Sequence, residues 1–341
     1  MKFLNPLIFV NLTLAAGCSF SSQNSTSSQS SSESSQTTGG PVNPIWNSAS
    51  GGSGSGTGQK IFDSSDITYI VFEKPFSLQN DLQSMISKIK AYRSGKTTLV
   101  CGQTADIQGL FLCVGNNRQA QHIPLMRPAI FAEGRPSIGV PSAYAVVPQQ
   151  VAQGAYSKSL GHDVPQFLLQ QFFESVRNSC SDLSCLLPGE LMFSQRVMGE
   201  FQRLAPMGYS VVSFDVESDA SIQGALKHEI AHGQFFQQQR YKFAVNMFWN
   251  TLSPQLQNAA RTFVKLNYDV NLTELVVNEF HAYVVDGTFS RLTPDAVQKS
   301  KQFDLEFGSA LEILYQQSSF LQLSLKNALM TSGERVWAGS L

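Results

Sequence analysis

The sequence predicts an α+β fold, with a small mixed or antiparallel sheet in the N-terminal half and mostly helices in the C-terminal half. Residues 59–163 contain short β-branched and aromatic runs between Gly and Pro, which is typical of strands. In residues 164–341, apolar residues recur at helical spacing. Because the 341-residue chain is 42% apolar, residues 59–341 can bury a substantial core as one domain made of these two parts.

Charge and apolar runs argue against two classes of protein. Only 14% of the residues are charged and the formal net charge is -1, so the chain lacks the basic field that nucleic-acid binding needs. Past the N-terminus, no stretch offers the roughly 18 consecutive apolar residues of a membrane-spanning helix. We therefore expect neither a nucleic-acid partner nor a transmembrane domain.

The first 18 residues are typical of an export signal. Lys2 precedes an apolar stretch that is too short to span a membrane, and small residues then lead into Cys18. This end resembles a bacterial lipoprotein signal, which implies that Cys18 is lipidated and becomes the mature N-terminus. Ala15 stands where such signals prefer a large aliphatic residue, and the alternative is an ordinary cleaved signal peptide. By the same resemblance, Ser19 is compatible with sorting to the outer membrane.

The segment 19–58 consists largely of Ser, Thr, Gln, Asn and Gly. Such a segment cannot bury enough apolar surface to offset its chain entropy, so we expect it to be a disordered tether. Its root-mean-square reach is roughly 35 Å. The sequence therefore predicts an exported protein whose lipid anchor on Cys18 holds the folded domain clear of the membrane.

Four further cysteines follow the tether. An even number in an exported chain favours two disulfides, and the pairs that are local in sequence are Cys101–Cys113 and Cys180–Cys185. Neither pair has the spacing of a zinc ribbon. We predict these two disulfides, although spacing alone leaves other connectivities open.

The strand-rich part divides into short elements. We expect a strand at 67–72, a helix at 81–92, and the two arms of a hairpin at 97–101 and 110–114. The short apolar runs 129–132 and 143–147 lie between Gly and Pro. His122 and His162 fall in loop-like stretches.

The second part is mostly helical, with one strand at 208–214. The apolar stripes predict helices at 165–178, 189–204, 222–240, 254–266, 272–286 and 294–331. Ser221 is a candidate cap for the third of these helices.

The motif His228-Glu229-Ile230-Ala231-His232 lies on the third helix. Positions four apart differ by about 40°, so His228 and His232 point the same way and can bind one metal ion. Glu229 lies about 60° from His232, which suits a carboxylate that takes a proton from metal-bound water. Because the chain has only 5 His, a chance match is rare. The motif predicts a zinc site, and the alternative is a surface helix with incidental His and Glu.

A catalytic zinc needs a third protein ligand and an open position for water. In the helix 272–286, Glu279 lies in the middle of the apolar stripe, whereas Glu274 and His281 lie on the far side, about 140° and about 160° away from it. A buried carboxylate is costly without a cation or hydrogen-bond partner, and a zinc ion is such a partner. We predict Glu279 as the third ligand; the alternative is an ion pair with a buried Arg or Lys.

This arrangement resembles the gluzincin zinc peptidases, which combine the same motif with a downstream helix that carries Asn-Glu, here Asn278 and Glu279. The resemblance covers residues 225–286. Phe235 and Gln238 stand where the metzincins place Gly and His, which argues against that group. The resemblance implies a zincin-like fold, Glu229 as general base and proton shuttle, and one zinc ion with these ligands: His228, His232 and Glu279.

Two departures from the gluzincin pattern concern the surroundings of the metal. The segment between His232 and Glu279 exceeds the shortest family spacing, which implies at least one inserted helix. Tyr283 replaces the Asp that thermolysin-like enzymes place four residues after the Glu, so Asp286 becomes the candidate for supporting His228. Tyr283 is a possible oxyanion stabiliser, and the alternative is a core Tyr whose hydroxyl is satisfied.

The residues therefore predict zinc-dependent hydrolysis of peptide bonds in an extracytoplasmic protein or peptide, with peptidoglycan cross-links as a further possible target. In zincins an edge strand ahead of the motif helix binds extended peptide, and 209–214 is either such a strand or an ordinary one. The alternative function is a lipid-anchored binding or adhesion lipoprotein on a zinc-stabilised, non-catalytic zincin fold. The intact Glu229 favours the enzyme, because metal binding alone does not require it.

Overall fold

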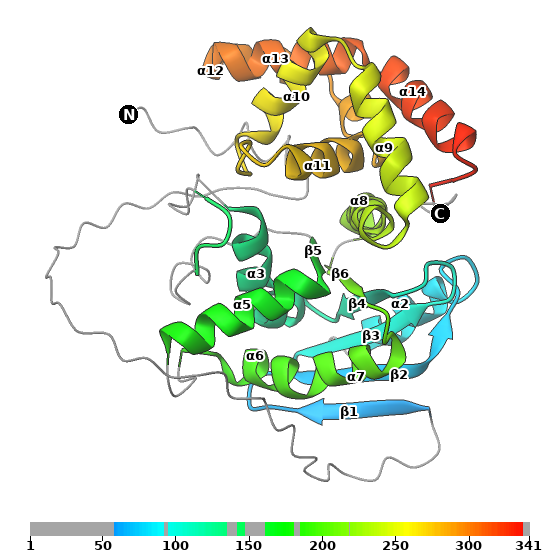
Figure 1. Ribbon diagram of the computed structural model, residues 1–341, viewed down its shortest axis with the longest axis vertical. Coiled ribbons are helices and arrows are strands. Elements are labelled where there is room, and N and C mark those ends of the chain that lie inside the picture. The colour runs from blue at the N-terminus through cyan, green and yellow to red at the C-terminus, as the bar shows by residue number, and fades with distance from the viewer. Residues whose placement is uncertain are drawn as a thin grey trace, which may run out of the picture.

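A computed structural model of the chain describes residues 58–91, 95–134, 142–146, 161–180, 185–217 and 219–336. The predicted lipoprotein signal, Cys18 and nearly all of the tether lie outside these ranges. The predicted α+β class is confirmed, because a six-stranded mixed sheet is followed by a mostly helical C-terminal half (Figure 1). No helix within the described ranges is both long enough and apolar enough to span a bilayer.

The sheet has the strand order β1-β2-β3-β4-β6-β5. Strand pairs alternate in direction: β2/β3 and β4/β6 are parallel, and β1/β2, β3/β4 and β5/β6 are antiparallel. The strands have these bounds: β1 Gln59–Asp63, β2 Thr68–Phe76, β3 Thr98–Thr104, β4 Leu110–Gly115, β5 Gly161–Pro165 and β6 Ser210–Asp215. The outermost strands are therefore β1 and β5, and β6 is an inner strand.

This order corrects one expectation about peptide binding. The segment 209–214 is not an edge strand, because β6 pairs with β4 on one side and with β5 on the other. The outer position belongs to β5, a five-residue strand in the stretch where His162 was expected in a loop. The run is short and contains Gly and Pro, so its strand character comes from pairing with β6 rather than from intrinsic preference.

The predicted hairpin is confirmed together with its disulfide. Cys101 of β3 lies opposite Cys113 of β4 in the antiparallel register, and the two cysteines form a disulfide bond. Both are fully buried on the face of the sheet that carries Tyr69 and Phe111. The bond therefore links β3 to β4 at the centre of the sheet, inside the core.

We expect the double variant Cys101→Ala/Cys113→Ala to lose stability. The disulfide closes a loop with a sequence separation of 12. Loss of that constraint on the unfolded chain lowers the free energy of unfolding by about 3 kcal/mol. Urea denaturation of both proteins measures the difference. The variant Cys180→Ala/Cys185→Ala is the control, and an equal loss in both variants would contradict the prediction.

The second predicted disulfide is not present, because Cys180 and Cys185 are thiols. The Cys185 amide donates a hydrogen bond to Cys180 Sγ at 3.2 Å. Burial, followed by the hydrogen bond with the Cys180 thiol, raises the pKa of Cys185 to about 11. A thiol with a raised pKa carries little thiolate, the form that reacts in disulfide chemistry.

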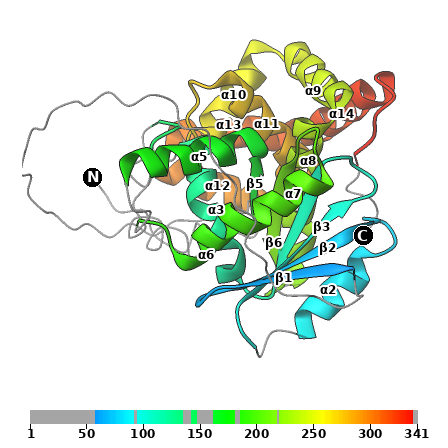
Figure 2. The same cartoon turned by 60° about the horizontal axis from the view of Figure 1, so that its bottom comes forward.

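Helices cover both faces of the sheet. On one face lie α3 Arg118–Glu133, α5 Gln166–Ser179, α6 Pro188–Met192, the π-helical η3 Phe193–Val197 and α7 Met198–Leu204. On the other face lie α2 Leu82–Ala91 and α8 Asp219–Gln237. Figure 2 shows α5, α6 and α7 in front of the sheet.

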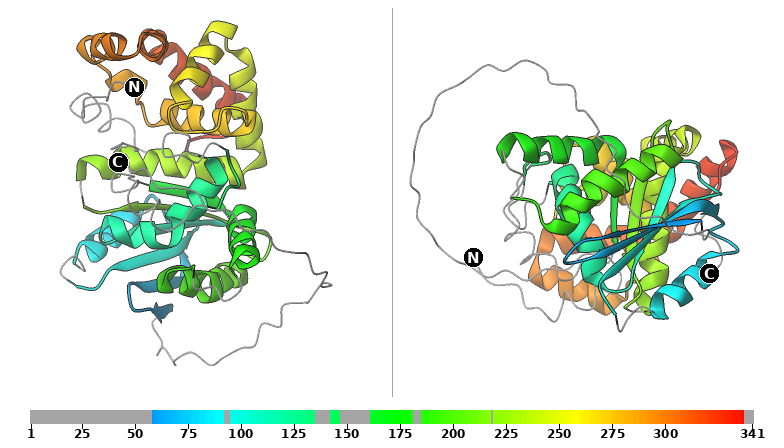
Figure 3. Two further views of the ribbon diagram at one scale, coloured as in Figure 1. Left: turned by 90° about the vertical axis from the view of Figure 1, so that its left-hand side faces the viewer. Right: turned by 90° about the horizontal axis from the view of Figure 1, so that it is seen from below.

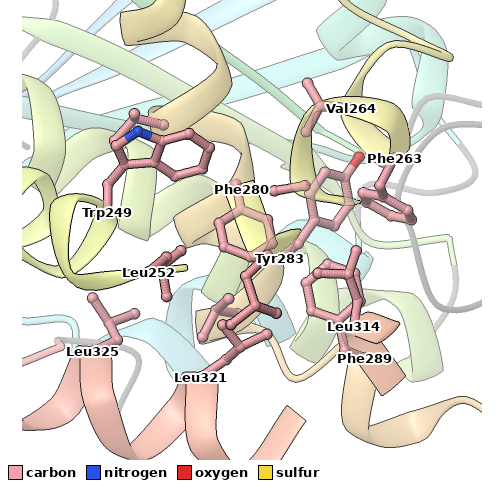
Figure 4. Packing of buried hydrophobic residues seen from close by; sticks show 14 of the residues in the cluster. Trp249, Leu252, Phe263, Val264, Phe280, Tyr283, Phe289, Leu314, Leu321 and Leu325 are labelled. Atoms are coloured by element: carbon pink, nitrogen blue, oxygen red, sulfur yellow. The ribbon is translucent and has the colours of Figure 1, made fainter. Parts of the chain in front are cut away.

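The remaining helices form a separate layer with its own apolar core. They are α9 Gln239–Thr251, α10 Pro254–Val264, α11 Thr273–Val285, the 3-10 turn η4 Phe289–Arg291, α12 Pro294–Phe303, α13 Leu305–Gln316 and α14 Ser318–Thr331. Phe280 and Tyr283 of α11 lie in the centre of this core (Figure 4). In the side view, α8 lies between this layer and the sheet (Figure 3, left).

Several predicted elements have different bounds in the structure. The run 129–132 is the last part of the long helix α3, and the described residues of 143–147 form a turn without a strand. The predicted helix 294–331 is three helices, because Asp304 has an extended backbone and accepts a hydrogen bond from Phe307 N as the cap of α13. The motif helix begins at Asp219, ahead of Ser221, and α9 was not predicted.

Candidate metal centre

Helix α8 carries the motif between two hydrophobic cores. Leu226 and Ile230 pack into the core beneath the sheet, whereas Phe235 belongs to the core of the helical layer. These contacts fix the rotation of α8 about its own axis. His228 and His232 consequently point toward α11, and their exposed fractions are 8% and 1%.

Helix α11 presents Glu279 to the two imidazoles. Its neighbours Val276, Phe280 and Tyr283 are buried in the helical core, and Glu279 itself is 1% exposed. As the sequence predicts, Glu274 lies elsewhere, on the exposed surface in an ion pair with Lys242. The acidic residue on the apolar stripe of the helix, Glu279, is therefore the one that lies beside the motif.

His281 contributes to the contact between α11 and α8 rather than to the metal ligand set. The ring is fully buried, and its Nε2 lies 3.3 Å from the carbonyl oxygen of Ala231. Burial, followed by the electrostatic effect of the neighbouring His232 ring, lowers the pKa of His281 to about 3. The neutral ring therefore donates from Nε2 to Ala231 and aligns the two helices.

The distances between the three predicted ligands suit a shared metal ion. His232 Nε2 lies 3.7 Å from Glu279 Oε1, and His228 Nε2 lies 3.9 Å from Glu279 Oε2. Both distances are too long for hydrogen bonds. Ligand atoms around one tetrahedral zinc at about 2.0–2.1 Å are about 3.3 Å apart, so a small contraction around an ion completes the set. Two imidazoles and one carboxylate are also a donor set that zinc accepts.

Asp286 supports His228 from behind. Its Oδ2 lies 3.1 Å from His228 Nδ1. The other oxygen, Oδ1, accepts hydrogen bonds from the backbone amide and hydroxyl of Thr288, both at 2.6 Å. A carboxylate beside Nδ1 holds the proton there and leaves the Nε2 lone pair for a metal ion. Asp286 thus occupies the supporting position for which the sequence offered it as a candidate.

We expect Asp286→Asn to weaken zinc binding by about 10- to 100-fold, because the amide orients the His228 ring less strongly than the carboxylate. Competition with a chromogenic chelator measures the affinity. Glu274→Gln, an exposed change on the same helix, is the control. Equal affinities in Asp286→Asn and wild type would show that Asp286 does not support the ligand.

The predicted general base, Glu229, lies against the outer strand of the sheet. Its side chain is 6% exposed. A Cβ atom built on Gly161, the first residue of β5, would lie 2.2 Å from Glu229 Oε1 and 2.6 Å from its Cδ. No real Cβ tolerates these distances, so the absence of a side chain at Gly161 creates the space for the Glu229 carboxylate.

Gly161→Ala is therefore expected to displace Glu229 while leaving the metal ligands in place. Because β5 is held in register with β6, the Glu229 side chain must move, and a misplacement of this size can lower hydrolysis about 100-fold. Zinc content and kcat measure the two effects separately. Gly199→Ala is the control, since nothing lies within 4 Å of a Cβ at that position. Full activity in Gly161→Ala would contradict the contact.

Two further carboxylates join the site, and both were missed in the sequence. Asp163 of β5 lies with its Oδ1 3.9 Å from His232 Nε2, and its ligating oxygen falls within 4.8 Å of donor atoms of Glu229 and His232. Glu133, at the end of α3, shares the same spacing with Asp163 and Glu279. Both are buried. Glu133 ends the apolar run 129–132, which is a weak signal by itself, and Asp163 follows no such run.

The other predicted residues lie around this centre. Tyr283 is 1% exposed, and its ring centroid lies 4.6 Å from that of His228 and 5.0 Å from that of Phe263 (Figure 4). His122 and His162 are not in loops, since they belong to α3 and β5 with ring centroids 5.3 Å apart. His162 alternates with Asp163 along the strand and therefore faces the opposite side of the sheet from Asp163.

The residues of α8, α11 and β5 thus define a buried centre that can hold a divalent metal ion beside a carboxylate that is not required for ligation. No protein-family model, curated protein or solved structure matches the chain.

Proposed function

We propose that the protein is a zinc-dependent peptidase that hydrolyses peptide bonds in an extracytoplasmic protein or peptide. The observation that carries the proposal is the convergence of His228, His232 and Glu279 beside Glu229. The donor set of two imidazoles and one carboxylate leaves one tetrahedral position for water, which is typical of catalytic rather than structural zinc. The gluzincin resemblance of the sequence leads to the same class.

Each residue then has one chemical task. A bound zinc ion would supply Lewis acidity and lower the pKa of a coordinated water. His228, His232 and Glu279 bind the ion, and Asp286 orients the first of them. Glu229 accepts the proton of the attacking water and passes it to the leaving amine.

The carboxylate of Glu229 also favours an enzyme over a purely structural site. It is buried next to His232, where an ionised group is costly to keep. A zinc centre that served only to hold α8 against α11 would gain nothing from it. The competing proposal, a binding or adhesion lipoprotein, gives Glu229 no task.

Export and anchoring are part of the same proposal and rest on the sequence alone. Lipidated Cys18 would hold the peptidase at a membrane, with the outer membrane as the expected location. Metabolic labelling with a fatty acid tests this part, with Cys18→Ser as the variant that should lose the label. An unlabelled wild-type chain would remove the anchor from the proposal and leave the peptidase chemistry unaffected.

The full chain, purified in detergent, tests the chemistry. We expect one zinc ion per chain and slow hydrolysis of an unfolded protein substrate such as casein, abolished by a chelator and restored by zinc. Absence of zinc would contradict the metal centre. A zinc-loaded chain that cleaves neither protein nor peptidoglycan would favour the binding lipoprotein instead.

A further inference from the structure

Helix α11 ends in a turn that carries Asp286 as its last helical cap. The next residue, Gly287, has a φ of +76°, a conformation that L side chains rarely adopt. Its amide donates a hydrogen bond to the carbonyl of Val284 at 3.3 Å. The amide of Thr288 donates to the carbonyl of Tyr283 at 3.1 Å. These two bonds form a Schellman motif, so the backbone of the turn is fixed relative to α11.

The residue that follows the turn anchors it in the core of the helical layer. Phe289 is buried, and its ring centroid lies 5.7 Å from that of Phe280 and 6.4 Å from that of Tyr283 (Figure 4). Thr288 is therefore held between the closed end of α11 and a packed aromatic ring. It is itself fully buried, and a buried hydroxyl group needs a hydrogen-bond partner.

The hydroxyl of Thr288 is directed at the Asp286 carboxylate. Asp286 Oδ1 accepts hydrogen bonds from the hydroxyl and from the amide of Thr288, both at 2.6 Å. The hydroxyl oxygen in turn accepts a hydrogen bond from Arg291 Nη2 at 3.4 Å, which leaves the hydroxyl hydrogen for Asp286. Arg291 Nη1 also donates to the backbone carbonyl of Asp286. One carboxylate oxygen is thus held by the turn, and the other lies 3.1 Å from His228 Nδ1.

We propose that Thr288 is a positioning residue of the metal centre, which sets the zinc affinity through Asp286 and His228. This inference rests on the proposed zinc site. A carboxylate that bonds only to the imidazole can turn about its side-chain torsions, and each turn weakens that bond. Two short bonds to Oδ1 remove this freedom, so the His228 ring keeps the orientation in which Nε2 faces an ion.

A purely local role is the competing explanation for the same contacts. An Asp that accepts a hydrogen bond from the backbone amide two residues on forms an Asx-turn, a motif that needs no metal. The hydroxyl of Thr288 is not part of that motif, and its additional bond to the same oxygen favours the positioning role. A local role predicts a loss of stability alone. The positioning role predicts a loss of zinc affinity that depends on Asp286.

The zinc affinity of the full chain, measured by competition with a chelator, tests the proposal. We expect Thr288→Val, which replaces the hydroxyl by a methyl group, to weaken zinc binding by about 10-fold. Thr288→Ser restores the hydroxyl and should bind zinc as wild type does. The double variant Asp286→Asn/Thr288→Val should bind zinc about as weakly as Asp286→Asn alone, because the effects of residues that act through one another do not add.

Thr293→Val is the matched control, because the Thr293 hydroxyl caps α12 by accepting a hydrogen bond from Ala296 N at 3.2 Å. The control should lose stability and keep its zinc affinity. An equal loss of zinc affinity in Thr293→Val and Thr288→Val overturns the inference, since general destabilisation would then explain both.

The remaining outcomes separate this inference from the zinc site. Equal zinc affinity in Thr288→Val and wild type overturns the inference and leaves the peptidase proposal standing. Additive losses in the double variant also overturn it, since Thr288 would then act without Asp286. A wild type without zinc refutes the proposed function itself. If Thr288→Val does not fold, the comparison of Thr288→Ala with Thr288→Ser decides, because the two variants differ only by the hydroxyl group.

Discussion

Replacing Glu229 by Gln is expected to lower kcat/KM by about 1,000-fold while one zinc ion remains bound. The amide keeps the size of the side chain and its place against Gly161, but it cannot accept the proton of the attacking water. His228, His232 and Glu279 are unchanged, so the metal affinity stays near that of wild type. We therefore expect the variant to lose hydrolysis and to keep its zinc.

Two measurements on the same preparation test this expectation. Zinc is quantified by mass spectrometry, and hydrolysis is followed with a fluorogenic casein. Glu312→Gln, a partly exposed change in an ion pair with Lys301 of the helical layer, is the control and should keep both. Undiminished hydrolysis in Glu229→Gln would remove Glu229 from the role of general base, whereas loss of zinc would make it a ligand.

Glu279→Ala is expected to have the largest effect on the metal itself. Removal of a ligand should weaken zinc binding by more than the about 10- to 100-fold that follows from loss of a supporting residue such as Asp286. The variant would also lose the stabilisation that bound zinc gives. For wild type, zinc raises the free energy of unfolding by about 4 kcal/mol when free zinc is 1,000 times above Kd. Zinc should therefore raise the melting temperature of wild type and leave that of Glu279→Ala unchanged.

The choice of control matters here because α11 is buried. Glu274→Ala lies on the same helix with an exposed side chain, so it reports the cost of an alanine in α11 without touching the centre. Equal zinc affinity in Glu279→Ala and Glu274→Ala would contradict the ligand assignment. In that case the carboxylate of Asp163, which also lies beside His232, would be the next candidate.

Elements with a clear local period were predictable from the sequence. Helix α2 begins and ends within one residue of its expected bounds, and the β3–β4 hairpin has the expected cysteine pairing. Helix α3 was not predictable, because Pro124 and Pro128 each remove a backbone donor from its interior. It persists because nearly all of it is buried and Asn117 accepts a hydrogen bond from the amide of Ala120 at its start.

The site shows the same division between local and tertiary information. His228, Glu229 and His232 follow from one motif, and Glu279 follows from the apolar stripe of its own helix. Asp163 and Glu133 reach the centre only through strand pairing and the path of α3, which no local pattern encodes. Asp286 is intermediate, since helical spacing suggests it but only the contact with His228 assigns it.

The long excursion of the chain between the two ligand-bearing helices has a consequence for the order of folding. A single turn of α8 brings His228 and His232 together, within about a microsecond. Glu279 can meet them only when the chain segment that contains α9 and α10 closes into a loop, which costs chain entropy. A nascent chain therefore offers an ion two imidazoles and holds it weakly, and tight capture waits for the helical layer. The rate at which the apo chain takes up metal tightly therefore reports the rate at which the helical layer assembles on the sheet.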